Sequence, residues 1–170
     1  DRATLKKVIN FLNSGSGVLD VAGGSGHVSL AFSLLGIKST VIDPRETVGK
    51  LPGRDRKIFK KAIRGKKNAM DKGEMQHESF LPPPIEYASL RAWFAKRPEG
   101  IDASFREGKS SGQLLHDDEA VPICTICSQE NNDLLQNCSA IVSLHPDEAT
   151  GDIVDFAVEH RIPFLIVPCC

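Results

Sequence analysis

The stretch from Val18 to His27 combines residue types and spacing that suit the binding of a nucleoside-type cofactor. It reads Val-Leu-Asp-Val-Ala-Gly-Gly-Ser-Gly-His, so an apolar run ends in a glycine-rich turn. Glycine lets a backbone turn sharply and approach a ligand, and the helix expected next offers free N–H groups and a positive dipole end. A second apolar run, Ser39–Ile42, ends in Asp43. A glycine loop after one strand and an acid after the next is how open α/β sheets hold such cofactors.

The spacing within the loop narrows the class of cofactor. The loop does not contain Gly-x-Gly-x-x-Gly, the fingerprint of dinucleotide-binding sites. The sequence from Asp20 to Gly26 instead resembles motif I of class I S-adenosylmethionine (SAM) methyltransferases, Asp/Glu-x-Gly-x-Gly-x-Gly, with Ala22 at the first glycine.

This resemblance implies SAM as the cofactor. In that family the loop lies against the methionine part of SAM, and the acid after the second strand binds the ribose hydroxyls. The implied cofactor-binding residues are Asp20, Ala22, Gly23, Gly24, Ser25, Gly26, His27 and Asp43. The alternative is an ordinary tight turn between strand and helix that binds no ligand.

The C-terminal region resembles one methyltransferase-like group. Its members carry Leu-His-x-Cys-Gly-x-x-Thr-Asp and, one strand later, Pro-Cys-Cys; this chain has Leu144-His-Pro-Asp-Glu-Ala-Thr-Gly-Asp152, and Pro168-Cys-Cys170. The group includes relatives of tRNA 2′-O-methyltransferases. Here Pro146–Glu148 replaces the x-Cys-Gly of the group. No Asp/Asn-Pro-Pro-Tyr tetrapeptide is present in the sequence, which disfavours methylation of exocyclic amines.

His145 and Asp147 are the candidate catalytic residues, because they follow a strand expected to end beside the cofactor. A histidine there can take a proton from an attacking hydroxyl or amine, and Asp147 can orient it or contact the cofactor amine. The alternative is structural: Asp147 caps the following helix, and His145 only holds the loop.

Composition predicts one soluble globular domain over residues 1–170. The hydrophobic fraction is 41% and the charged fraction 25%, and no apolar stretch approaches the roughly 20 residues that span a bilayer. The five cysteines, an odd number without a secretory signal, predict reduced thiols in an intracellular protein. Cys124-x-x-Cys127 lacks the second pair typical of structural zinc, so we predict no metal site, although Cys138 or a histidine could complete one.

Apolar runs alternate with amphipathic stretches, which predicts a Rossmann-like α/β fold with a parallel sheet. Compared with the sheet of the family that the sequence resembles, this sheet would lack the last two strands, and a protein partner could cover the exposed edge. The expected strands are 18–22, 39–42, 121–126, 140–144 and 164–167, and the expected helices are 4–12, 27–35, 128–135 and 148–160.

Residues 45–120 form a large expected insertion whose first part, Lys50–Lys72, is strongly basic. This segment has ten lysines and arginines and two aspartates, a net charge of +8. It would attract a polyanion such as RNA, as a helix over Arg54–Lys67 or as a solvated loop. Nearby Tyr87, Trp93 and Phe94 could stack on bases, but packing of an inserted helix onto the core is favoured.

The function expected from these observations is SAM-dependent methylation of RNA. A catalytically inactive methyltransferase-like module that binds RNA or ribosomes is the main alternative. A small-molecule methyltransferase, for which the basic segment is irrelevant, is a third.

Overall fold

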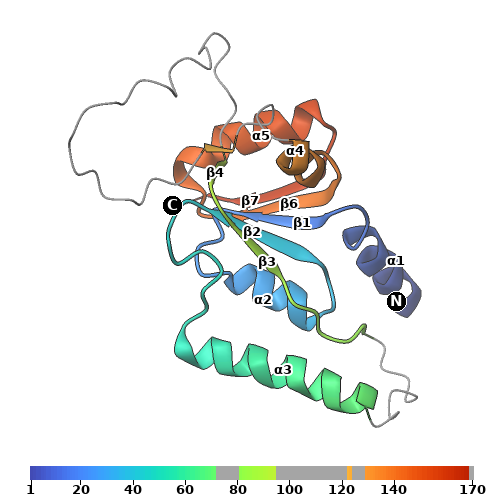
Figure 1. Ribbon diagram of the computed structural model, residues 1–170. Coiled ribbons are helices and arrows are strands. Elements are labelled where there is room, and N and C mark those ends of the chain that lie inside the picture. The colour runs from blue at the N-terminus through green and yellow to red at the C-terminus, as the bar shows by residue number, and fades with distance from the viewer. Residues whose placement is uncertain (72–80, 95–121, 124–128, 169–170) are drawn as a thin grey trace, which may run out of the picture.

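The computed structural model describes residues 1–71, 81–94, 122–123 and 129–168. Their central element is a five-stranded sheet in the order β3-β2-β1-β6-β7 (Figure 1), and every neighbouring pair in it is parallel. Its strands are β1 Gly17–Val21, β2 Ser39–Asp43, β3 Ala88–Arg91, β6 Cys138–Leu144 and β7 Phe164–Val167. The predicted α/β fold with a parallel sheet is confirmed, and this sheet is compatible with a Rossmann-like arrangement.

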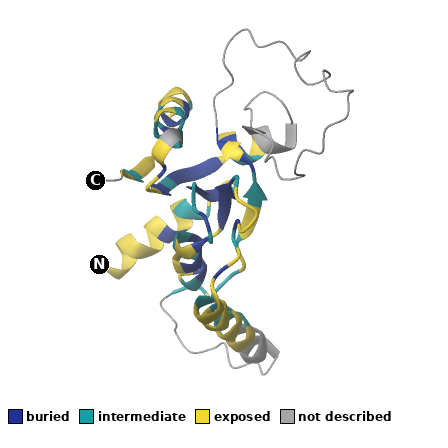
Figure 2. Ribbon diagram, turned by 90° about the vertical axis from the view of Figure 1, so that its left-hand side faces the viewer, coloured by how far each residue is buried: buried dark blue, intermediate teal, exposed yellow. Residues whose placement is uncertain are grey.

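Helices cover both faces of the sheet, which explains why β1 and β2 are buried along their whole length. The helices are α1 Arg2–Leu12, α2 His27–Leu34, α3 Gly53–Asp71, α4 Gln129–Gln136 and α5 Thr150–Glu159, with a short 3₁₀ turn, η2, at Asp147–Ala149. In Figure 1, α4 and α5 lie on one side of the sheet and α2 on the other, with α3 beyond α2. Figure 2 shows the buried residues concentrated in the sheet and exposed residues along α1 and α3.

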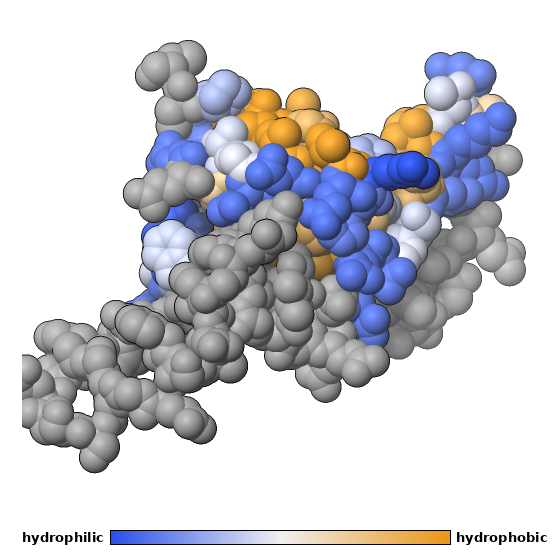
Figure 3. Space-filling model, turned by 90° about the horizontal axis from the view of Figure 1, so that it is seen from above, coloured by the Kyte–Doolittle hydropathy of each residue, from blue (hydrophilic) through white to orange (hydrophobic). Residues whose placement is uncertain are grey.

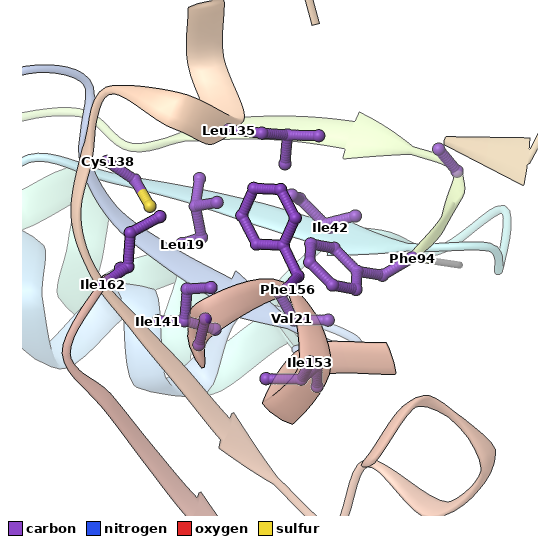
Figure 4. Packing of buried hydrophobic residues seen from close by; sticks show 12 residues of the cluster. Leu19, Val21, Ile42, Phe94, Leu135, Cys138, Ile141, Ile153, Phe156 and Ile162 are labelled. Carbon is purple, nitrogen blue, oxygen red and sulfur yellow. The ribbon is translucent and has the colours of Figure 1, made fainter. Parts of the chain in front are cut away.

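Side chains of β1 alternate between two apolar clusters, as the period of a strand requires. Leu19 and Val21 join the larger cluster, which includes residues of α4 and α5, and Val18 joins Ile9 of α1 in the smaller one. The ring of Phe156 from α5 lies at the centre of the larger cluster (Figure 4). It meets Phe94 edge-on, with 5.6 Å between ring centroids. Asp20, between Leu19 and Val21, therefore faces α2.

The third strand of the sheet is not where the sequence predicted it. Ala88–Arg91 pairs with β2 and supplies the edge strand β3, within the segment expected to be an insertion. From the predicted strand 121–126, only Pro122–Ile123 is described as a strand, β5, which pairs with β4, Trp93–Phe94. The expectation of an inserted helix around Tyr87–Phe94 is therefore wrong. An edge strand as exposed as Ala-Ser-Leu-Arg carries no apolar run that would reveal it.

Strand β7 forms the other edge of the sheet and is largely exposed. Phe164, Leu165 and Val167 keep 43%, 58% and 42% of their surface accessible. Among the described residues, β6 is the only strand that pairs with β7. Figure 3 shows the molecule from above, and apolar side chains form orange patches on the face in view.

Over the described ranges, none of the helices has both the length and the apolar character needed to cross a membrane.

Candidate functional site

A pocket of about 520 Å³ lies where strands β1, β2 and β6 and the β3–β4 segment end. Ligands of open parallel sheets bind at this carboxyl edge, and volumes of roughly 300–1,000 Å³ are typical of small-molecule sites. The pocket is lined by Val21, Ala22, Ile42, Asp43, Pro44, Arg45, Ala92, Trp93, Phe94, Leu144, His145, Pro146, Asp147 and Ala149. Of the predicted site residues, Ala22, Asp43, His145 and Asp147 are thus brought to one cavity.

The glycine loop connects β1 to α2 through a left-handed backbone. Ala22, Gly24 and Gly26 have φ angles of 55°, 53° and 87°. Glycine adopts such angles without strain, whereas alanine does so at a cost of roughly 1–2 kcal/mol. Ala22, the departure from motif I, therefore holds a conformation that glycine would hold more easily.

Gly23 is required for a different reason, namely space. A Cβ atom at this position would lie 2.5 Å from Cγ and from Oδ1 of Asp20. Since real Cβ atoms do not approach so closely, any side chain at position 23 would push the carboxylate away. The loop can cross Asp20 only because this residue is glycine.

Asp20 lies beneath the loop and is not part of the pocket lining. Its Oδ2 accepts hydrogen bonds from the backbone N–H and the hydroxyl of Ser29, at 3.1 and 2.9 Å, which ties β1 to α2. Its Oδ1 is buried and has no hydrogen-bond partner among the described residues. Burial raises the pKa of Asp20 to about 6, although the bonds from Ser29 act in the opposite direction.

Asp43 ends β2 with a carboxylate that lines the pocket. Oδ2 accepts a hydrogen bond from the backbone N–H of Gly24 at 2.9 Å, so the acid also holds the glycine loop in place. Burial acts to raise the pKa of Asp43, but hydrogen bonds from Arg45 and Gly24 outweigh it and hold that pKa below its ordinary value. Asp43 is therefore ionised at neutral pH.

Arg45 is a pocket residue that sequence reasoning missed. Its Nε lies 2.8 Å from Oδ1 of Asp43, and its Nη2 lies 2.8 Å from Oδ2, a bidentate pair. The Asp-Pro-Arg order after a strand was the available signal, because an arginine two residues after an acid can reach back to it.

His145 and Asp147 follow β6 with unusual backbone angles. Their φ values are 55° and 45°, a conformation that non-glycine residues rarely adopt and that often accompanies functional sites. The backbone N–H of His145 donates to the carbonyl of Val167 in β7 at 2.8 Å, which fixes the turn. Asp147 is the first residue of η2, whose N-cap is Pro146, and α5 is capped at Ala149. The alternative in which Asp147 caps the helix is thus wrong.

The remaining predicted cofactor residues do not line the pocket. Gly23, Gly24, Ser25 and Gly26 form the loop behind it, and the lining contains none of them. His27 is exposed, and its Nε2 lies 3.2 Å from Oδ2 of Asp55 in α3. The side chain of His27 therefore contacts α3, whereas the resemblance to motif I had implied a contact with the cofactor.

The three aromatic residues of the insertion have different surroundings. Tyr87 packs at 5.2 Å on Phe59 of α3 and donates to the carbonyl of Gly49 at 2.9 Å. Phe94 is buried in the core, so packing onto the core is confirmed for Phe94, whereas Tyr87 packs against α3. Trp93 is 46% exposed and lines the pocket, which leaves one aromatic face available there.

The basic segment forms helix α3, as one of the two alternatives predicted. Lys57, Lys60, Lys61 and Arg64 recur at helical spacing and line a shallow hollow of about 390 Å³ on its exposed side. We call these four residues the basic face. The Phe59–Tyr87 and His27–Asp55 contacts attach the helix to the domain. Lys72 lies outside the described residues.

Cys138 is buried, and burial raises the pKa of its thiol to about 11, so it is an unreactive thiol. Cys124, Cys127, Cys169 and Cys170 lie outside the described residues. Within the described ranges, no three side chains of the metal-binding types come together.

Comparison with known proteins does not identify a relative. Searches of protein-family models, of curated proteins and of solved structures found no match to this chain.

Proposed function

We propose that this pocket binds S-adenosylmethionine and that the protein is a SAM-dependent methyltransferase that acts on RNA. One observation carries the proposal: Ala22 of the loop after β1, Asp43 at the end of β2 and His145 after β6 line a single pocket. These three residues come from segments that are far apart in the chain.

The residues of the pocket fit a nucleoside with a ribose. Asp43 is an ionised carboxylate, which accepts hydrogen bonds from ribose hydroxyls. Trp93 and Leu144 line the pocket with 46% and 41% of their surface exposed, so they supply apolar surface on which a purine base can lie. Bound there, SAM would supply an activated methyl group. The protein would position a substrate oxygen or nitrogen against it, and His145 would accept the proton released from that atom.

The basic face of α3 supports RNA as the substrate. Four positive side chains on one exposed stripe match the repeating negative charge of a nucleic-acid backbone. Replacing Lys57 and Lys61 by glutamate should weaken RNA binding. It should also make the plot of log binding constant against log salt concentration less steep, by roughly 0.7–0.9 in slope for each phosphate contact removed. The matched control reverses Lys6 and Lys7, two exposed lysines of α1. If the α3 variant keeps the RNA affinity of the parent, the basic face does not bind RNA and this support for an RNA substrate is lost.

Calorimetric titration with S-adenosylhomocysteine tests the cofactor. We expect the parent to bind, Asp43→Asn to bind at least about tenfold more weakly because ribose contacts are lost, and Lys7→Ala to match the parent. Transfer of a labelled methyl group to total cellular RNA then tests turnover, and His145→Ala should slow it by about 10²–10⁴. A folded parent that does not bind S-adenosylhomocysteine would refute the proposal.

A binding module without turnover is the second candidate, and two observations favour it. The exposed apolar strand β7 is an edge at which a protein partner could add a strand. The carboxylate of Asp43 is already paired with Arg45. This candidate predicts RNA or protein binding by the parent with no affinity for S-adenosylhomocysteine.

A further inference from the structure

Arg45 saturates the carboxylate that the proposed function assigns to the ribose. Oδ1 of Asp43 accepts from the backbone N–H of Arg45 at 2.9 Å and from its Nε at 2.8 Å. Oδ2 accepts from Gly24 N–H at 2.9 Å and from Arg45 Nη2 at 2.8 Å. Since a carboxylate has about four acceptor positions, none is left for a ligand.

The four hydrogen bonds to Asp43 differ in how easily they can be given up. The bond from Gly24 comes from the loop backbone, and a second comes from the backbone of Arg45 itself. The two side-chain bonds come from a guanidinium on a long, flexible stem whose side chain is 65% exposed, whereas that of Asp43 is 2% exposed. The guanidinium can therefore leave toward solvent, while the carboxylate stays in place.

The position of the guanidinium makes it an obstacle to a ligand. Nη2 lies only 2.6 Å from the point where a Cβ of Gly24 would stand, so it rests directly on the glycine loop. Arg45 also lines the pocket. A ligand that approaches both the loop and Asp43 meets the guanidinium first.

From this geometry we infer that Arg45 is a latch: it occupies the diol-recognition position of Asp43 and must swing out when a ribose binds, so that it sets the affinity for the nucleoside. The inference rests on the proposed function. A vicinal diol would replace both side-chain bonds, donating to the two oxygens that the guanidinium now holds. The latch favours ligands that carry both hydroxyls, because a single hydroxyl cannot replace a bidentate partner.

The experiment measures the affinity of S-adenosylhomocysteine for the parent and for Arg45→Ala and Arg45→Gln, with Lys7→Ala as a control for loss of an exposed positive charge. Glutamine keeps much of the length of arginine but provides neither the charge nor the fork. Thermal unfolding establishes that each variant is folded. We expect about tenfold tighter binding for both Arg45 variants, since a bidentate charged pair no longer has to open. The 2′-deoxy counterpart of S-adenosylhomocysteine should gain clearly less.

Salt gives an independent readout. Raising ionic strength weakens the exposed part of the Arg45–Asp43 pair, so the parent should gain affinity for S-adenosylhomocysteine, whose ribose diol carries no charge, relative to Arg45→Ala. If the parent binds and the folded Arg45 variants bind equally or more weakly, the latch is refuted and the proposed function stands. If neither the parent nor the variants bind, the proposed function fails, and the latch fails with it.

Discussion

Gly23 offers a sharp test of the site geometry, because its substitution by alanine should destabilise the protein through one contact. The added Cβ would lie 2.5 Å from Cγ and Oδ1 of Asp20 and 2.7 Å from Oδ2. Asp20 is fully buried and is held by Ser29, so the carboxylate cannot move aside without losing those bonds.

Two terms set the magnitude for Gly23→Ala. Forcing an extra methyl into a packed interior costs about 1–3 kcal/mol. Weakening the hydrogen bonds from Ser29 to a charged acceptor adds about 1.5 kcal/mol or more. We therefore expect the free energy of unfolding to fall by about 3 kcal/mol, or roughly 6–12 °C in Tm for a chain of this length.

Urea denaturation followed by circular dichroism measures this loss, and Gly65→Ala is the matched control. A Cβ at Gly65, inside α3, meets nothing within 4 Å. The same substitution should there stabilise the helix by roughly 0.8–1 kcal/mol, because alanine favours helix over glycine. The two changes are chemically identical and should have opposite signs.

A double-mutant cycle identifies the responsible contact. In an Asp20→Ala background the carboxylate is absent, so Gly23→Ala should cost less than half of its value in the parent. The reasoning is refuted if Gly23→Ala costs under 0.5 kcal/mol, or if its cost is unchanged when Asp20 is alanine.

Three further predictions concern stability. The pKa of Asp20 is raised to about 6 in the fold, so the native state holds a proton that the unfolded state has released between about pH 4 and 6. The contribution of Asp20 therefore falls by about 3 kcal/mol as pH rises through that window, and Asp20→Asn should remove this slope in urea titrations at successive pH values. Ala22→Gly relieves a left-handed alanine and should stabilise by roughly 0.5 kcal/mol once the extra entropy of unfolded glycine is subtracted; a loss of stability in the same urea assay would contradict this. Phe156→Ala empties the centre of the larger cluster and should cost about 3–5 kcal/mol, whereas a cost below 1 kcal/mol would contradict the packing in Figure 4.

The spacing of apolar residues, together with glycines that end helices, predicted most strands of the sheet. Val18, Leu19 and Val21 belong to an apolar run that only Asp20 interrupts, which is close to the pattern of a strand covered on both faces. Gly36, left-handed at φ 68°, marks the end of α2 as expected for a glycine after a helix. Strand β3 escaped prediction because it is half exposed, and its partner β2 defines it through backbone bonds that leave no trace in side-chain pattern.

The sequence alone determined the local features around the β1–α2 loop. It specified where the chain turns, that an acid follows the second strand, and that Lys50–Lys72 is strongly basic, because these depend on residue type and local spacing. Only the tertiary structure decided which of these groups face a common cavity. It brought His145 and Asp43 to one pocket, turned His27 toward Asp55, buried Asp20 beneath the loop and laid Arg45 across the carboxylate of Asp43. The physical reason is that strand order and side-chain direction arise from contacts between distant segments, which local spacing does not encode.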